Sequence, residues 1–199
     1  MKTENVILMQ MARESLKGKW GLAIGTLIVY FLIATTLQII PIVGPIASLI
    51  ISGPFALGLA TFSLSISRDQ DPKLEKIFQG FNNFGTALGA YLLMLLFILL
   101  WTLLLIIPGI IAAISYSMTF YILADDNTIG AMDAINKSKK MMNGYKWKYF
   151  CLGLRFIGWT LLCVLTLGIG FLWLMPYMQV SMAKFYDDVK SNSLTSENI

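Results

Sequence analysis

The feature that most constrains this chain is an apolar run from Phe84 to Ala124, which contains no charged residue and holds a Pro-Gly pair. As one α-helix the run would be roughly 60 Å long, at about 1.5 Å per residue. The hydrocarbon core of a bilayer is only about 30 Å thick. Because proline and glycine allow a helix to stop and the chain to reverse, the run predicts two membrane spans joined by a tight turn at Pro108 and Gly109.

The composition of the whole chain supports a membrane protein. Hydrophobic residues make up 57% and charged residues 13%, with a mean hydropathy of +0.71. Soluble domains carry about 25% charged residues, so this chain lacks the surface of a soluble protein. The net charge of +4 is small, and the lysines flank apolar segments, which favours a bilayer surface over nucleic acid. There is no histidine and no cluster with metal-ligand spacing, so we expect neither a metal site nor a cofactor.

The apolar segments predict an all-α, polytopic fold with six transmembrane helices. The expected spans are Trp20–Ile40, Ile42–Ile66, Phe84–Ile107, Gly109–Ala124, Phe150–Leu167 and Ile169–Tyr186. Each pair is joined by a very short connection, which predicts three helical hairpins. The residues expected to make these turns are Pro41, Gly44, Pro108, Gly109, Gly168 and Gly170.

The distribution of charge predicts the orientation. Every acidic residue, and every basic residue except Arg155, lies in the N-terminal segment, the two long connections or the C-terminal end, if Lys184 near the end of the sixth expected span is counted with the C-terminal end. The short turns carry no charge. The positive-inside tendency therefore predicts cytoplasmic N- and C-termini. The first residues show no cleavage site for a signal peptide, so we expect the first apolar segment to remain as a span.

Recurring residue pairs suggest an internal repeat within a single membrane domain, residues 1–199. Pro54-Phe55, Ser115-Tyr116 and Pro176-Tyr177 recur at intervals of about 61 residues, in the second helix of each expected hairpin. The repeat units would cover about 1–67, 68–126 and 127–190, followed by a short polar tail, 191–199. A threefold pseudo-axis along the membrane normal would make Phe55, Tyr116 and Tyr177 equivalent.

Three amphipathic stretches predict helices that lie in the cytoplasmic interface. They are NVILMQMARESLKGKW, DPKLEKIFQGF and DDNTIGAMDAINKSKKMM, the last two with N-caps at Asp71 and at Asp126 or Asn127. Their apolar sides would face lipid and their cations would face anionic headgroups. The basic residues expected at this surface are Lys137, Lys139, Lys140, Lys146 and Lys148.

Few residues offer chemistry. The spans contain hydroxyl groups but no Asp, Glu or His, so no base accompanies the serines and we expect no enzymatic activity. Arg155 is the one charge in the interior of an expected span, since Lys184 stands close to the end of the sixth. It could reach the headgroups, pair with one of the acids that end the second helices, or hold a lipid phosphate. Those acids, for which capping or pairing with lysines is favoured over metal binding, are Asp125, Asp126, Asp187 and Asp188.

The longest motifs carry a family resemblance. They are ARESLKGKWG, FQGFNNF, LWTLLLIIPGIIAAISYSMTFYILADD, AINKSKKMMNGYKWKYF and LTLGIGFLWLMPYMQVSMAKFYDD. In this order they resemble a bacterial, mainly Firmicutes, multi-pass integral-membrane family of unknown function. Its members are similar to the membrane regions attached to some glycerophosphodiester phosphodiesterases. The resemblance covers nearly the whole chain and implies a multi-pass protein of the plasma membrane, without implying an activity.

Two functions remain open at this stage. The leading hypothesis is a non-enzymatic scaffold or accessory protein that contacts anionic lipids on the cytoplasmic face, a membrane-protein partner or further copies of itself. The alternative is a small transporter or channel, with a polar path between the hairpins lined by the hydroxyl groups of the second helices.

Overall fold

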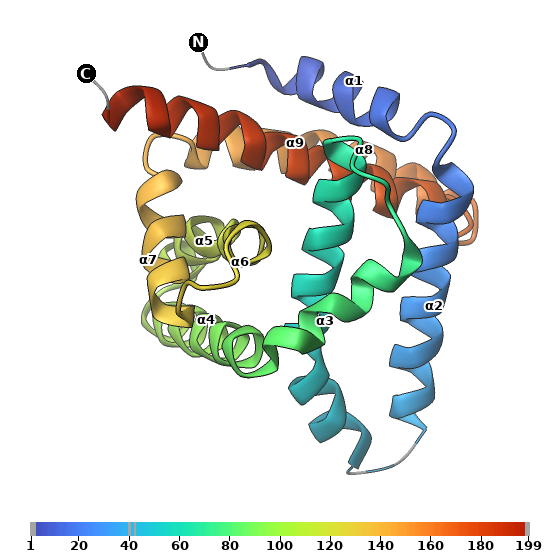
Figure 1. The fold of residues 1–199 in the computed structure, drawn as a ribbon, viewed down its shortest axis with the longest axis horizontal. Coiled ribbons are helices and arrows are strands. Elements are labelled where there is room, and N and C mark those ends of the chain that lie inside the picture. The colour runs from blue at the N-terminus through green and yellow to red at the C-terminus, as the bar shows by residue number, and fades with distance from the viewer. Residues whose placement is uncertain (1–2, 40, 42, 198–199) are drawn as a thin grey trace.

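The computed structural model describes residues 3–39, 41 and 43–197, and all regular structure in these ranges is helical (Figure 1). In chain order the elements are α1 (Asn5–Ser15), α2 (Trp20–Gln38), α3 (Val43–Ser67), the 3-10 helix η1 (Leu74–Asn83), α4 (Phe84–Leu104), α5 (Ile106–Tyr116), α6 (Thr119–Asp125), α7 (Ala131–Met141), α8 (Lys146–Leu165) and α9 (Phe171–Glu197).

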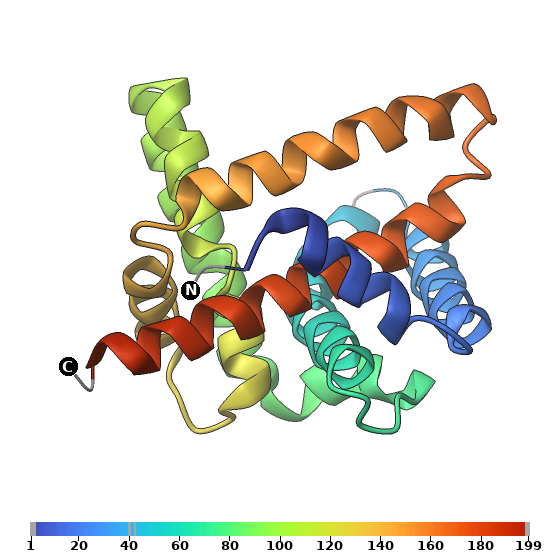
Figure 2. The ribbon, with the colours of Figure 1, turned by 90° about the horizontal axis from the view of Figure 1, so that it is seen from above.

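The long helices form three pairs that run in different directions. The pairs are α2 with α3, α4 with α5 and its continuation α6, and α8 with α9, and their turns lie at separate corners of the molecule (Figures 1 and 2). The shorter helices cover the region where the pairs meet. In that region α1 lies along α9, η1 packs across α3, and α7 packs against α4 and α6.

Five of the expected spans are confirmed as helices long and apolar enough to cross a membrane, within the described residues. They are Trp20–Gln38, Gly44–Ser67, Leu74–Leu104, Ile106–Asp125 and Lys146–Leu165. The fourth is interrupted by a turn at Ser117 and Met118, between α5 and α6. The expected sixth span falls on α9, which is not among the five, and so stays a prediction.

Pro108 and Gly109 do not form the turn that the sequence predicts. The reversal takes place at Leu105, which is extended and separates α4 from α5. Pro108 lies in the first turn of α5, where a helix tolerates proline because the missing N–H would have no partner. Gly168, with a φ of +89°, does lie in the turn between α8 and α9. Of the first turn, Pro41 is described and lies in a turn conformation.

A glycine closes each of the three helix pairs at the same relative position. A Cβ atom added to Gly44 would lie 2.2 Å from the carbonyl oxygen of Leu37, and one added to Gly109 would lie 2.2 Å from Oγ1 of Thr102. At the third tip, a Cβ on Gly170 would lie 2.7 Å from Sγ of Cys163. In every case the neighbour is the residue seven positions earlier in the chain. The lack of a side chain at these glycines therefore allows the second helix to approach the first directly after the turn.

The backbone also enters α2 and α8 in the same way. Gly18 and Gly144 both have positive φ, 77° and 78°, and each is the third residue after the preceding helix ends. The amides of Lys19 and Tyr145 donate to the carbonyls of Leu16 and Met142 at 2.9 and 3.1 Å. The first and third helix pairs thus begin with the same local structure, which agrees with a repeat.

The predicted caps of the interfacial segments are wrong. Asp71 has a φ of 42° and pairs with Lys73, and it is Lys73 that precedes η1 as N-cap. Asp126 accepts hydrogen bonds from the amide and hydroxyl of Thr128, and α7 begins only after Gly130. Asp126 stabilises the loop before α7, because a short carboxylate also hydrogen-bonds to nearby backbone in turns, whereas Asp71 pairs with the side chain of Lys73.

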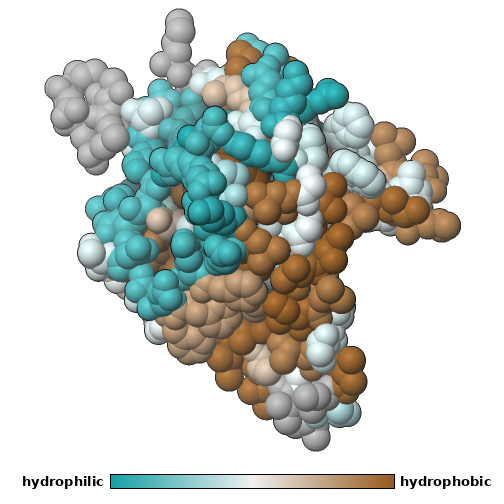
Figure 3. All heavy atoms as spheres, turned by 45° about the vertical axis from the view of Figure 1, so that its right-hand side comes forward, coloured by the Kyte–Doolittle hydropathy of each residue, from teal (hydrophilic) through white to brown (hydrophobic). Residues whose placement is uncertain are grey.

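Buried and exposed apolar residues are separated along the molecule. The middle of α9 is enclosed by its neighbours, with Ala183, Phe185 and Val189 at 0% exposure. The tips of the pairs are instead bare, since Leu103 is 84% and Leu167 is 95% exposed. Figure 3 shows hydrophilic residues gathered over one part of the surface and hydrophobic residues covering the projecting parts. Such a surface is suited to lipid and not to water.

Replacement of Gly109 by alanine tests the closure of the α4–α5 tip. The new methyl group would also meet Cα of Thr102 at 2.9 Å, so backbone must move, and we expect a loss of about 1–3 kcal/mol in stability. Gly158→Ala in α8 is the matched control, because its Cβ meets nothing within 4 Å and alanine favours a helix. Thermal unfolding in detergent, followed by circular dichroism, measures both. Equal stability of the two variants would contradict the close contact.

Candidate functional site

Arg68 joins the three helix pairs where they meet. It follows the last residue of α3, and its Nη1 lies 2.5 Å from Oδ1 of Asp125 at the end of α6. Its Nη2 lies 2.6 Å from Oδ1 of Asp187 in α9. Asp125 also accepts hydrogen bonds from Lys190 Nζ at 2.5 Å and from the hydroxyl of Tyr186 at 2.9 Å. One arginine and two carboxylates therefore connect α3, α6 and α9.

The charges of this cluster compensate one another in a partly buried place. The side chain of Arg68 is 27% exposed, and those of Asp125 and Asp187 are 12% and 30% exposed. Hydrogen bonds to Asp125 and then Asp187 raise the pKa of Arg68 above its already high value, although burial acts in the opposite direction. Arg68 therefore stays cationic at every accessible pH, and the cluster is a structural joint.

Removal of this cation should loosen the joint. Arg68→Gln leaves two carboxylates facing each other without their shared partner, and we expect a loss of about 3 kcal/mol in the free energy of unfolding. Lys73→Gln removes a cation whose pair with Asp71 is largely exposed and should change stability little. Thermal unfolding of both variants in detergent is the measurement. A stability of Arg68→Gln equal to that of Lys73→Gln would show that the joint is dispensable.

A second ion pair holds the N-terminal segment and α8 to α9. Asp188 lies 2.5 Å from Lys148 Nζ, and it accepts hydrogen bonds from the amide and the hydroxyl of Thr3. Both charged side chains are well buried, at 7% and 14% exposure. Burial by itself would raise the pKa of Asp188, but the hydrogen bonds from Lys148 and Thr3 outweigh it and lower the pKa. Lys148 is thus enclosed in the protein. The prediction from the sequence that it faces lipid headgroups is wrong.

The lowered pKa of Asp188 predicts a pH dependence of stability. The carboxylate is favoured in the folded protein relative to an unfolded aspartate with a pKa near 3.9. The stabilisation is therefore complete above about pH 4 and is lost as the pH falls further. We expect Asp188→Asn to lose about 2–3 kcal/mol at pH 7, and the difference from wild type to shrink at pH 3. Unfolding in detergent at the two pH values measures this, and a difference independent of pH would contradict it.

The other predicted basic residues lie near the surface. Lys137, Lys139 and Lys140 are exposed on α7, and Lys146 is half-buried at the start of α8. They form no ion pair within the described ranges. Their position agrees with a surface that faces anionic headgroups, and their contact with lipid stays a prediction.

Arg155 is not the partner of the aspartates. Asp125, Asp187 and Asp188 pair with Arg68, Lys148 or Lys190, and Asp126 accepts hydrogen bonds from Thr128. Arg155 is exposed on α8 and has no ion pair or hydrogen bond with any described residue. The physical reason is position, because Arg155 lies more than two turns along α8, away from the joint. Of the three alternatives for Arg155, the pair with an aspartate is therefore wrong, and the cation that joins Asp125 and Asp187 is Arg68.

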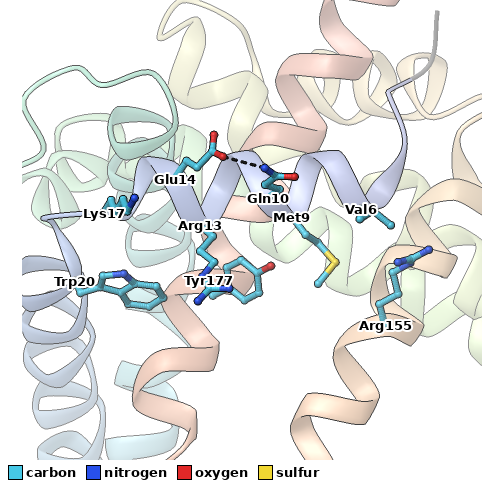
Figure 4. Close-up of a pocket in the computed structure, with 9 residues that line it drawn as sticks. All are labelled: Val6, Met9, Gln10, Arg13, Glu14, Lys17, Trp20, Arg155 and Tyr177. Carbon is cyan, nitrogen blue, oxygen red and sulfur yellow. Dashed lines mark hydrogen bonds between the residues drawn. The ribbon is translucent and has the colours of Figure 1, made fainter.

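Arg155 lines a groove that is bounded by α1, α8 and α9 (Figure 4). The groove has a volume of about 740 Å³. Its lining residues are Val6, Met9, Gln10, Arg13, Glu14, Lys17, Trp20, Arg155 and Tyr177. Figure 4 shows Arg13 beside Tyr177 at one side and Arg155 at the other, on either side of the space beneath α1. Cations from two elements thus flank one hollow, which we call the cationic groove.

An apolar hollow of about 400 Å³ continues from the cationic groove. The two share Arg13, Trp20 and Tyr177, and the second adds Trp159, Gly170, Trp173 and Leu174. Both added tryptophans are about half exposed, at 54% and 51%. The combined space has a charged end and an aromatic, apolar end.

A third hollow, of about 320 Å³, lies between the helix pairs. Residues from α2, α3, α4, α6 and α9 line it, together with Ser117. Its polar side chains are Tyr30, Ser52, Tyr91, Ser117, Tyr121 and Gln179. This central pocket is lined by neutral hydroxyl and amide groups and corresponds to the polar cavity that the second hypothesis requires.

The long apolar helices and their exposed apolar sides are those of a membrane-embedded, all-helical protein. The chain belongs to the family described as protein of unknown function (DUF975), whose profile matches residues 1–115 and again 102–193. The family assignment agrees with the resemblance seen in the sequence, and the two overlapping matches weakly suggest an internal repeat. No curated protein and no solved structure matches the chain. The bacterial origin and the similarity to phosphodiesterase membrane regions stay predictions.

Arg68 is the residue that reasoning from the sequence missed. The segment SRDQD stands at the end of the second helix of its pair, as ADDN and YDDVK do. In that position it supplies a cation where the other two supply acids. The opposite charge of Arg68 at a helix end equivalent to those of the aspartates was therefore the sequence feature that pointed to the ion pairs. It predicts a pairing only once the three helix ends are known to meet.

Proposed function

We propose that this protein is a non-enzymatic, six-span membrane scaffold or accessory protein that interacts with lipids, with both termini in the cytoplasm of a bacterial cell. The observation that carries the proposal is the separation of surfaces. Ion-paired residues gather where the three pairs meet, and bare apolar helices project from that joint. A bilayer would receive the projecting helices, and the charged joint would face the cytoplasm.

Three hairpins of two spans each follow from the repeated local structure. Gly44, Gly109 and Gly170 close the pairs in the same way, and the overlapping family matches agree with duplication. The sixth span would be α9, whose lower hydropathy has a physical cause. Its polar half contributes Asp187, Asp188 and Lys190 to ion pairs and is enclosed by other helices, so those residues do not need to face lipid.

The hydroxyl groups support a role without catalysis. Ser52, Ser63, Ser115 and Ser181 each donate a hydrogen bond of 2.6–2.7 Å to the carbonyl four residues earlier in their own helix. Each of these hydroxyl groups is engaged by its own helix, and no described residue that could act as a base accepts a hydrogen bond from it. The second-helix serines therefore serve packing in this proposal.

Cysteine labelling tests the orientation of the spans. In a protein with Cys151→Ser and Cys163→Ala, single cysteines are introduced by Gln70→Cys at the joint and by Leu105→Cys or Leu167→Cys at two tips. An impermeant maleimide added outside intact cells should label the two tip positions and leave position 70 unlabelled until the membrane is opened. Labelling of all three from the same side would overturn the hairpin arrangement.

The central pocket favours a transporter as the second candidate. Tyr30, Tyr91 and Gln179 line it, and their polar side-chain groups donate and accept no hydrogen bond within the described residues. A neutral, hydrogen-bonding solute would fit such a lining. Flux of small polar solutes into liposomes that hold only this protein, abolished by Gln179→Leu, would support transport. Absence of flux across a broad panel would leave the scaffold as the function.

A further inference from the structure

The starting observation is an arginine without a partner inside an apolar helix. Arg155 lies in α8, which is one of the helices able to span a membrane, and no described residue pairs with its guanidinium. An unpaired cation within a span is costly unless it reaches water or an anion. The side chain of Arg155 lines the cationic groove, so the groove is where such an anion would lie.

The groove has an excess of positive charge. Arg13 of α1 and Lys17 in the turn after α1 line it with Arg155, and neither has an ion pair in the described part of the chain. The single acid, Glu14, accepts a hydrogen bond of 3.1 Å from Gln10 and pairs with none of the three cations. Three cations that form no ion pair with any described residue thus surround one acid, and this lining is complementary to an anion. Arginine is also suited to phosphate, since its planar fork donates two parallel hydrogen bonds.

The apolar continuation identifies the kind of anion. Beyond Arg13, Trp20 and Tyr177 the hollow is lined by Trp159, Trp173 and Leu174, at the end where α8 and α9 approach their turn. A soluble phosphate would use only the charged end. A phospholipid would use both ends, with its phosphate near the arginines and an acyl chain against the tryptophans.

We propose that the cationic groove and its apolar continuation form a binding site for one anionic phospholipid of the surrounding bilayer. Arg155 and Arg13, which lie at different ends of the groove, attract the anionic headgroup, and α1 covers it. The proposal rests on the membrane function inferred above and adds to it a defined site with a defined class of ligand. It also gives the N-terminal segment a purpose beyond anchoring, because α1 supplies Arg13 and the turn that follows it supplies Lys17.

Native mass spectrometry of the detergent-solubilised protein tests the site. The probes are dioleoyl phosphatidylglycerol, dioleoyl phosphatidylcholine, the short-chain dihexanoyl phosphatidylglycerol and inorganic phosphate. We expect one tightly bound dioleoyl phosphatidylglycerol per chain, with the zwitterionic and short-chain lipids and free phosphate held at least about tenfold more weakly. Equal binding of the two dioleoyl lipids would overturn the proposal, and so would free phosphate bound as well as the anionic lipid.

Variants assign the binding to the groove. Arg155→Gln and Arg13→Gln should each weaken binding of dioleoyl phosphatidylglycerol by about tenfold or more. Lys139→Gln is the matched control, because it removes an equally exposed cation from α7, outside the groove. Trp159→Ala should weaken the binding of dioleoyl phosphatidylglycerol and leave the binding of dihexanoyl phosphatidylglycerol unchanged. If Lys139→Gln weakened binding as much as Arg155→Gln, the attraction would come from general surface charge and the site would be rejected.

The outcome is separable from that of the proposed function. Cysteine labelling reports the hairpin arrangement whether or not a lipid is bound. If the tips are labelled from outside and position 70 is not, but the protein shows no selectivity for the anionic lipid, the lipid site is rejected and the proposed scaffold stands. Labelling of the joint and the tips from one side would remove the scaffold arrangement itself, regardless of any lipid bound in detergent.

Discussion

The arrangement of the molecule depends on the ion pairs of Arg68 with Asp125 and Asp187. The three helix pairs project in different directions, so the apolar tips cannot hold one another together (Figures 1 and 2). The pairs meet at the ends of α3 and α6 and in the second half of α9, where the ion pairs lie beside a buried apolar cluster that includes Leu64, Leu123 and Phe185. In a membrane, helices gain little from hydrophobic association, so a polar contact at a shared end is an effective way to fix their relation.

Close backbone contact serves the same purpose at the opposite ends. Within each pair, a glycine at the start of the second helix allows it to approach the first helix directly after the turn, as at Gly109 and Thr102. Each pair is thus closed at its tip by the absence of a side chain and fixed at its base by charge. The same solution in all three pairs, and the same entry into α2 and α8 at Gly18 and Gly144, agrees with an origin by duplication.

Two kinds of cation follow from this architecture. Arg68 and Lys148 are partly or largely enclosed and pair with aspartates, so they hold the fold together. Arg13 and Arg155 line a groove, form no ion pair with any described residue, and can bind an anion from outside the chain. The division explains how a protein with so few charged residues can both fix its helices and present a charged surface to lipid, since each cation serves one purpose.

The sequence by itself determined the membrane class, the positions of the long helices and the separation of charged from apolar ends. These follow from hydropathy and length, which act on each segment independently. The sequence could not determine which charged residues form ion pairs. Arg68 and Asp187 lie far apart in the chain, and only the packing of α3, α6 and α9 brings them together. The turn at Leu105 and the caps of η1 and α7 also depended on local backbone packing. Only the tertiary structure placed Arg155 and Arg13 in the lining of one groove, since the groove forms only when α1 packs along α9.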